Sequence, residues 1–349
     1  MQVLRAVAVL LVAMLHTSQE LSPEAPSVVP DFGSYGVDIF FVISGFIMSA
    51  ITLRSDQPAG PGAAWAFLKR RLIRIFPIYW IFVILTGTRM LLSQGRFDLS
   101  YLPSVFLLPG SQFPYFKGLV SFSWTMMFEM YFYYVFAVVL LITVRRAVPL
   151  VIVLLSFAVI LGLFVGIARP YFIVACNPML LEFLFGAALA LLHQHFGTRR
   201  RTGIVLLSLG VVASFVLRNS PFPWPNGLQR VVTGANLMPS VLTWGVAAAM
   251  MVGGIIFWQP EFKTRLGKIA VILGNASYST YLASGLTVEF TDRLLLKIHR
   301  RSVPLSYGME AFYEMLMVAS VFVVGWACYQ FIEWPMLRSL QGKLRKAPA

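Results

Sequence analysis

Two polar residues interrupt the apolar segment MQVLRAVAVLLVAMLH at the start of the chain, Arg5 and His16, which are eleven positions apart. A histidine exchanges its proton near neutral pH and is therefore suited to act as a general base. An arginine stays charged and presents a planar fork of donors that matches phosphate or carboxylate oxygens. On a helix the two side chains would lie about 16 Å apart along the axis. The spacing predicts an anion-binding group and a proton acceptor at opposite ends of one path.

Other apolar segments also carry charges, and a charge within a membrane costs several kcal/mol and usually faces a cavity or a partner. They are Asp38 in GVDIFFVISGF, Arg71 and Arg74 in RRLIRIFPIYW, Glu129 in SFSWTMMFEMYFYY, and Glu182 in NPMLLEFLFG. The two arginines are one helical turn apart and share a helix face. A carboxylate beside His16 would fix the tautomer of the imidazole and stabilise its protonated form, as in a catalytic dyad. Asp38 and Glu129 are the candidates for that role.

Each of these residues also has a purely structural interpretation. Arg5 could extend to the inner headgroups, and the arginines of RRLIRIFPIYW could serve only as topology signals. His16 could be an interfacial residue, and the carboxylates could bind a serine or tyrosine for packing alone. If the charges work together, the acids and His16 lie in the outer half of the membrane and the arginines lie at its inner mouth.

The elements that must position these residues are membrane-spanning helices, since 58% of the 349 residues are hydrophobic and only 12% are charged. A span needs about 20 mostly apolar residues. We predict an all-α, polytopic transmembrane helix bundle with about ten spans, at 1–17, 34–53, 72–92, 121–143, 148–168, 178–195, 202–218, 238–258, 270–291 and 311–333. The first rises only about 24 Å to His16, so we expect it to be tilted or the natural chain to begin earlier. The membrane domain is predicted over 1–335, followed by a short basic cytoplasmic tail over 336–349.

Basic clusters determine the expected orientation. The 28 Lys and Arg residues exceed the 14 Asp and Glu residues, but they occur as short groups between apolar runs, which indicates topology and not nucleic-acid binding. Clusters follow the second, fourth, sixth, eighth and tenth predicted spans, so the positive-inside rule places both termini in the cytoplasm. A group containing Arg300 and Arg301 disagrees with this assignment. We expect an inner-membrane protein, and neither the histidines nor the two cysteines predict a metal site.

The same segments together resemble the integral-membrane acyltransferase 3 family, whose members O-acylate sugars of surface polysaccharides. LRAVAVLLVAMLH is similar to the family signature of an arginine, ten residues and a histidine. GVDIFFVISGF, RRLIRIFPIYW, SWTMMFEMYFY, LGNASYSTYL and FIEWP resemble further family segments in the same order. NPMLLEFLFG and the short loops look most like the exopolysaccharide O-acetyltransferase branch. The chain departs from the family at Ser284, where members commonly have a histidine after the tyrosine-leucine pair.

The resemblance implies a donor, an acceptor and roles for the charged residues. The donor would be a cytoplasmic acyl coenzyme A, most simply acetyl-CoA, and the acceptor a hydroxyl of a surface polysaccharide or its lipid-linked precursor. Arg71 and Arg74 would hold phosphates, and Arg5 would meet the donor deeper in the bundle. His16 would be the general base, with Asp38 or Glu129 as its carboxylate. A transporter or flippase for a lipid-linked glycan or an anion remains the alternative, because charges at two depths would serve a substrate path equally well.

Overall fold

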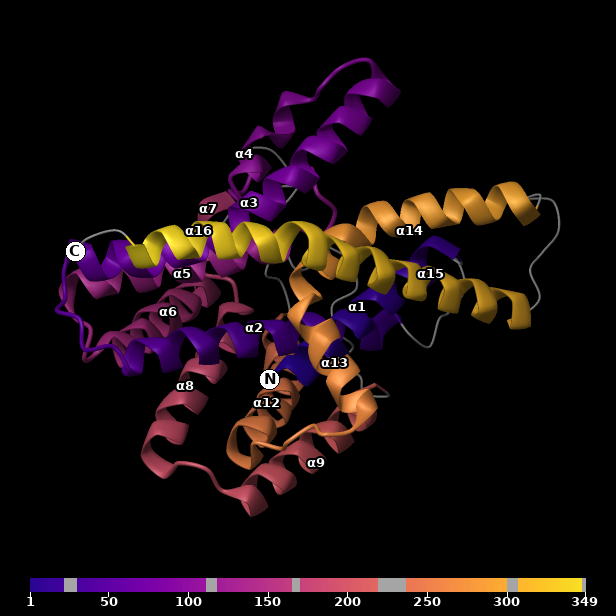
Figure 1. The fold of residues 1–349 in the computed structure, drawn as a ribbon. Coiled ribbons are helices and arrows are strands. Elements are labelled where there is room, and N and C mark those ends of the chain that lie inside the picture. Colours follow the sequence, from indigo (N-terminus) through magenta and orange to yellow (C-terminus); the bar gives the residue numbers. More distant parts are fainter. Residues whose placement is uncertain (22–29, 111–117, 165–169, 219–236, 300–306, 347–349) are drawn as a thin grey trace.

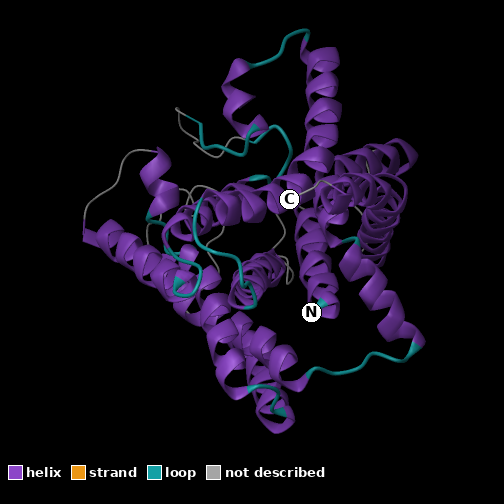
Figure 2. Cartoon of the chain, turned by 60° about the vertical axis from the view of Figure 1, so that its left-hand side comes forward, coloured by secondary structure: helices purple, strands orange, loops and turns teal. Residues whose placement is uncertain are grey.

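The computed structural model describes residues 1–21, 30–110, 118–164, 170–218, 237–299 and 307–346, and within these ranges all regular structure is helical (Figures 1 and 2). The first half of the chain forms α1 (Gln2–Leu21), α2 (Pro30–Leu53), α3 (Pro61–Gln94), the short η1 (Leu99–Tyr101) and α4 (Leu102–Val105), α5 (Trp124–Ile142) and α6 (Ala147–Phe164). The predicted all-α class is confirmed.

The second half continues with α7 (Pro170–Ala175), α8 (Leu180–Phe196), α9 (Arg200–Leu217) and α11 (Leu237–Ser240). The π-helical turn η2 (Val241–Gly245) joins α11 to α12 (Val246–Trp258), and α13 (Arg265–Asn275) and α14 (Ser277–His299) follow. A second π-helical turn, η3 (Tyr329–Glu333), joins α15 (Tyr307–Cys328) to α16 (Trp334–Lys346). α16 therefore runs across the predicted boundary between the membrane domain and the basic tail.

Nine helical segments in the described part of the chain are long and apolar enough to cross a membrane. They match nine of the predicted spans, although the third extends over 61–94 and the last over 308–340. The predicted span 270–291 is not a single helix, because α13 ends at Asn275 and α14 begins at Ser277. α14 also buries several hydroxyl side chains, among them Ser279, Thr280 and Ser284, which lower its hydropathy. Arg300 and Arg301, the discordant basic residues, lie outside the described residues.

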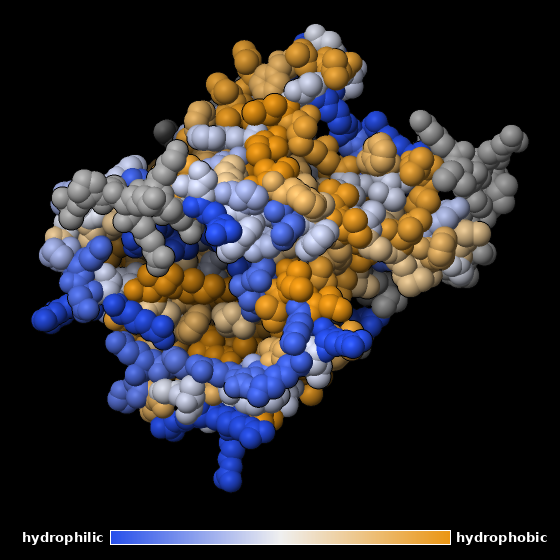
Figure 3. All heavy atoms as spheres, in the orientation of Figure 1, coloured by the Kyte–Doolittle hydropathy of each residue, from blue (hydrophilic) through white to orange (hydrophobic). Residues whose placement is uncertain are grey.

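The surface agrees with a membrane environment. Large apolar areas cover the face shown in Figure 3, and polar side chains gather mainly along its left and lower margins. The α2–α3 connection, which contains Arg54, and the α8–α9 connection, which contains Arg199, lie at the left and lower left of the same view (Figure 1). Apolar side chains that would be costly to expose to water are instead available to lipid, for example Phe164 and Val216, which are 83% and 65% exposed. The chain is an integral membrane protein.

Close helix packing sets the rotation of α2, which lines the central cavity described below. A Cβ added at Gly45 would lie 2.0 Å from the carbonyl oxygen of Phe183 on α8, and one added at Gly186 would lie 2.1 Å from the carbonyl oxygen of Val42. Only glycine permits the two backbones to approach this closely, as in small-residue interfaces of other membrane helices. The face of α2 that carries Gly45 is therefore fixed against α8.

Candidate active site

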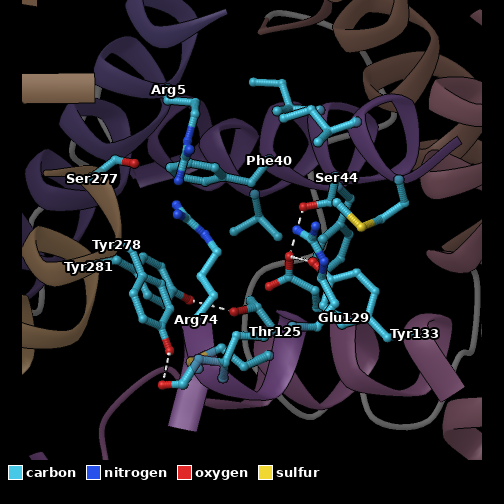
Figure 4. Close-up of a pocket in the computed structure, with 18 residues that line it drawn as sticks. Arg5, Phe40, Ser44, Arg74, Thr125, Glu129, Tyr133, Ser277, Tyr278 and Tyr281 are labelled. Atoms are coloured by element: carbon cyan, nitrogen blue, oxygen red, sulfur yellow. Dashed lines mark hydrogen bonds between the residues drawn. The ribbon is translucent and has the colours of Figure 1, made fainter. Parts of the chain in front are cut away.

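A cavity of about 270 Å³ lies where α1, α2, α3, α5 and α14 meet, and we call it the inner cavity. α2 lines it with residues at helical spacing, among them Val37, Phe41, Ser44 and Met48, on a face next to the α8 contact. Phe41 also stacks on Phe183 of α8, with the ring centroids 4.5 Å apart. α14 contributes aromatic and hydroxyl side chains, Ser277, Tyr278 and Tyr281, to another side of the cavity (Figure 4). The charged side chains that line the inner cavity are Arg5, Arg71, Arg74 and Glu129.

The three arginines reach the inner cavity from two helices. Arg5 comes from the first turns of α1, and Arg71 and Arg74 come from α3. The guanidinium groups of Arg5 and Arg74 face each other across the cavity in Figure 4, and they are close enough to repel each other electrostatically. Like charges are held together in a buried place only where something compensates for them. The structure thus brings together the three arginines that the sequence predicted to bind an anion.

Glu129 provides part of that compensation. Its Oε1 accepts a hydrogen bond of 2.8 Å from Ser44 Oγ and another from the Tyr133 hydroxyl. Arg5 and Arg71 both lie close enough to attract this carboxylate. Figure 4 shows Ser44, Glu129 and Tyr133 as a hydrogen-bonded group on one wall. Glu129 therefore belongs with the arginines of the inner cavity.

Glu333 is the second carboxylate that compensates for the arginine charges. The sequence analysis did not assign it a role. It is 1% exposed and ends the π-helical turn η3, within the FIEWP segment. Its Oε2 accepts a hydrogen bond of 2.5 Å from Ser279 Oγ, while its Oε1 is buried without a hydrogen bond among the described residues. Arg5 and Arg74 lie close enough to attract it. The signal available in the sequence was an acidic residue in the apolar closing segment FIEWP. The structure adds that Glu333 ends a π-helical turn, a feature that often marks functional sites.

His16 lies in a different place, a polar pocket of about 480 Å³ that we call the outer pocket. Its lining residues come from the end of α1, the turn before α5, and α14, and none of them lines the inner cavity. The His16 ring stacks on Phe122 with the ring centroids 3.3 Å apart. Gln19 is within hydrogen-bonding reach of the ring, and Nδ1 is buried without a hydrogen bond among the described residues. The structure therefore separates His16 from the arginines, as the spacing predicted.

Acidic and basic side chains also surround the outer pocket. Glu289 on α14 accepts hydrogen bonds from Arg293, at 2.5 Å, and from Arg89 on α3. Glu20 and Asp292 line the same pocket. Carboxylates and guanidinium groups at one mouth offer both acceptors and donors to a hydroxyl-rich molecule. This arrangement was not predicted, because the charges come from helices far apart in the sequence.

Asp38 lines neither cavity. It is 1% exposed, and its nearest acidic partner is Glu182 on α8, also 1% exposed, within hydrogen-bonding reach. A Cβ added at Gly245, in the turn η2, would lie 3.0 Å from Cγ of Glu182, so the turn packs directly against this carboxyl. The structure does not bring Asp38 to His16.

Comparison with known proteins identifies the family. The acyltransferase 3 family, described as an acyltransferase domain, matches residues 1–330. The exopolysaccharide production protein ExoZ of Rhizobium meliloti (strain 1021) is 29% identical over 326 residues, which are 91% of this chain and 93% of that protein. A protein of Staphylococcus aureus (strain COL) named "Putative O-acetyltransferase" is 24% identical over 95% of this chain, which spans 56% of that relative's length. No solved structure matches the chain. With a helical membrane bundle, a cluster of arginines in a cavity between its helices and a family match over nearly its whole length, the chain belongs to the acyltransferase 3 family of membrane acyltransferases.

Proposed function

We propose that the protein transfers an acyl group, most simply acetyl, from cytoplasmic acyl coenzyme A to a hydroxyl of a sugar in a surface polysaccharide or its lipid-linked precursor. The observation that carries this proposal is the separation of two sites on α1. Arg5 joins a cluster of arginines in the inner cavity, and His16 lies in a polar pocket at the other end of the helix. A charged donor and a neutral, hydroxyl-bearing acceptor require two such environments.

The inner cavity suits the acyl donor in charge and in size. Its three guanidinium groups and the two neighbouring carboxylates leave a net positive charge when all are ionised, which favours a polyanionic ligand. At about 270 Å³ the cavity is smaller than the roughly 300–1,000 Å³ pockets that enclose whole drug-sized ligands. It would therefore take the narrow thioester-bearing arm of the donor, with the phosphates held by the arginines at its mouth.

The outer pocket suits the acceptor and the chemistry. A sugar hydroxyl is a weak nucleophile, and His16 would remove its proton as the hydroxyl oxygen forms a bond to the thioester carbonyl carbon. The carbon–sulfur bond then breaks, the acyl group stays on the sugar oxygen as an ester, and the coenzyme A thiolate leaves and receives a proton. The unpartnered Nδ1 of His16 is available to a second group that orients the ring.

We keep as a proposal that Asp38 or Glu129 supplies the carboxylate that orients His16. Glu129 is held by Ser44 and Tyr133 in the inner cavity, where a role in placing the donor or its arginines fits its contacts. Asp38 shares a buried site with Glu182. Either carboxylate would act on His16 only after leaving these contacts.

We propose the inner membrane as the location, with both termini cytoplasmic. The basic clusters after alternate spans support this orientation. Reporter proteins fused after Arg54 and after Ala349 should both give cytoplasmic signals. An extracytoplasmic signal at Ala349 would reverse the orientation of the last span and contradict the assignment.

Mass spectrometry of surface polysaccharide tests the function directly. Cells that contain the protein should carry O-acyl groups that are absent from cells without it and from cells making the His16→Ala chain at the same level. Unchanged acylation would refute the acyltransferase proposal. Loss of the whole polysaccharide from the surface, with its acylation pattern unaltered, would instead favour the transporter or flippase alternative.

A further inference from the structure

The turn before α5 contains a residue in an unusual backbone conformation. Phe122 has a φ of 65°, in the left-handed region that side chains other than glycine, asparagine and aspartate rarely adopt. Such conformations persist only where the surroundings hold them, and they concentrate at functional sites. The contacts of Phe122 must therefore explain why the chain maintains it.

Two hydroxyl groups hold the Phe122 backbone. Its carbonyl oxygen accepts hydrogen bonds from the Tyr281 hydroxyl, at 2.9 Å, and from Thr125 Oγ1, at 3.3 Å. The two hydroxyl groups also bond to each other at 2.8 Å. The turn is pressed against α14 as well, since a Cβ added at Gly285 would lie 2.6 Å from Cβ of Ser121. These contacts fix Phe122 from α5 and from α14 at once.

Phe122 lies between the two cavities. Thr125 and Tyr281, which bind its carbonyl, line the inner cavity, and Figure 4 shows both at that cavity's wall. Phe122 itself lines the outer pocket, where its ring covers the His16 ring at a centroid distance of 3.3 Å. In this arrangement the aromatic ring occupies the face of His16, and the hydrogen-bonded turn separates His16 from the arginine cavity.

We propose that Phe122 is a gating and positioning residue: its side chain seals the inner cavity from the outer pocket, and transfer requires the ring to turn away from His16. This inference rests on the proposed function, because a gate is needed only if a donor in one cavity must meet an acceptor in the other. The left-handed backbone keeps the ring over His16 while the sites are apart. The seal would also exclude water from the thioester until an acceptor is present.

Cysteine accessibility tests the seal without any assay of transfer. Cys176 and Cys328 are replaced by alanine, and Val37→Cys places one thiol in the inner cavity. Intact cells are then treated with a membrane-impermeant maleimide. We expect slow labelling with Phe122 in place and labelling at least tenfold faster in the Phe122→Ala chain. Tyr281→Phe, which removes one of the bonds to the Phe122 carbonyl, should give an intermediate rate.

Controls make the result interpretable. Phe290→Ala is the matched substitution, since Phe290 lies on α14 and is 70% exposed, and it should leave the labelling of the Val37→Cys thiol slow. Glu20→Cys reports on the outer pocket and should label quickly in every background. If the Glu20→Cys thiol labels only in inverted membrane vesicles, labelling of the Val37→Cys thiol with and without Phe122 is compared in those vesicles. Equal rates with Phe122, leucine or alanine at position 122, in protein that elutes as one folded species, would overturn the gate.

A second measurement separates failure of the gate from failure of the proposed function. With purified protein and acetyl coenzyme A but no acceptor, Phe122→Ala should raise thioester hydrolysis at least fivefold over the natural chain. A chain that transfers acyl groups but shows neither faster labelling nor faster hydrolysis retains the proposed function and has no gate at Phe122. Faster labelling in a chain that transfers nothing would keep the seal and remove the proposed role in acyl transfer.

Discussion

Replacing His16 by alanine should lower the rate of acyl transfer by roughly 10² to 10⁴, the range for loss of a general base. Donor affinity should be nearly unchanged, because His16 lines the outer pocket and the arginines line the inner cavity. Initial rates with acetyl coenzyme A and an oligosaccharide acceptor give the first quantity, and equilibrium titration of the purified protein with the donor gives the second.

The matched control for this prediction lies on the same helix. Arg5→Ala should impair donor binding or positioning with the base still present, so the two variants should fail in different ways. Near-normal turnover in the His16→Ala chain would reduce His16 to an interfacial residue and direct the search for the base to Asp38, Glu129 or Glu182.

Replacing Arg71 or Arg74 by alanine should weaken acyl coenzyme A binding by about 1.5–3 kcal/mol, the usual loss for a hydrogen bond to a charged group. This corresponds to a roughly 10- to 150-fold higher Kd. Both side chains line the inner cavity from one face of α3. Lysine at either position should restore only part of the affinity, because it carries the charge without the planar fork. Titration with the donor at fixed ionic strength measures the change.

Arg70 provides the control for this prediction. It is the neighbouring basic residue on α3, it is exposed, and it does not line the inner cavity. Arg70→Ala should therefore leave the donor Kd unchanged while removing the same positive charge from the same region. If all three alanine variants bind the donor like the natural chain, these arginines serve only as topology signals.

The sequence was sufficient for the class of the protein and for the separation of Arg5 from His16. Long apolar segments form helices in a membrane because every backbone polar group must be paired within the segment. Since a helix has a fixed rise per residue, the eleven positions between Arg5 and His16 place them in two different sites before any packing is known. The predicted span 270–291 has no counterpart among the nine long apolar segments of the described chain. Its helix is interrupted at Ala276, and α14 contains many hydroxyl groups.

Only the tertiary structure decided which side chains face one another. Asp38, Val42 and Gly45 share a face of α2, and the glycine contact with α8 turns that face toward Glu182, away from His16. A neighbouring face then carries Ser44 to Glu129. The rotation of a helix about its axis depends on its neighbours, and no spacing within one apolar segment specifies it.

Dependence on neighbouring helices also explains why the sequence analysis gave no role to Glu333 and Tyr281. Glu333 reaches Arg5 and Arg74 from the far end of the chain, and Tyr281 reaches the Phe122 carbonyl from α14. The sequence by itself determined an all-helical membrane acyltransferase with an arginine site and a histidine site at the two ends of its first helix. Packing between helices distant in the sequence decided which carboxylates join the arginines and what separates the two sites, because those contacts depend on helix rotation and close approach.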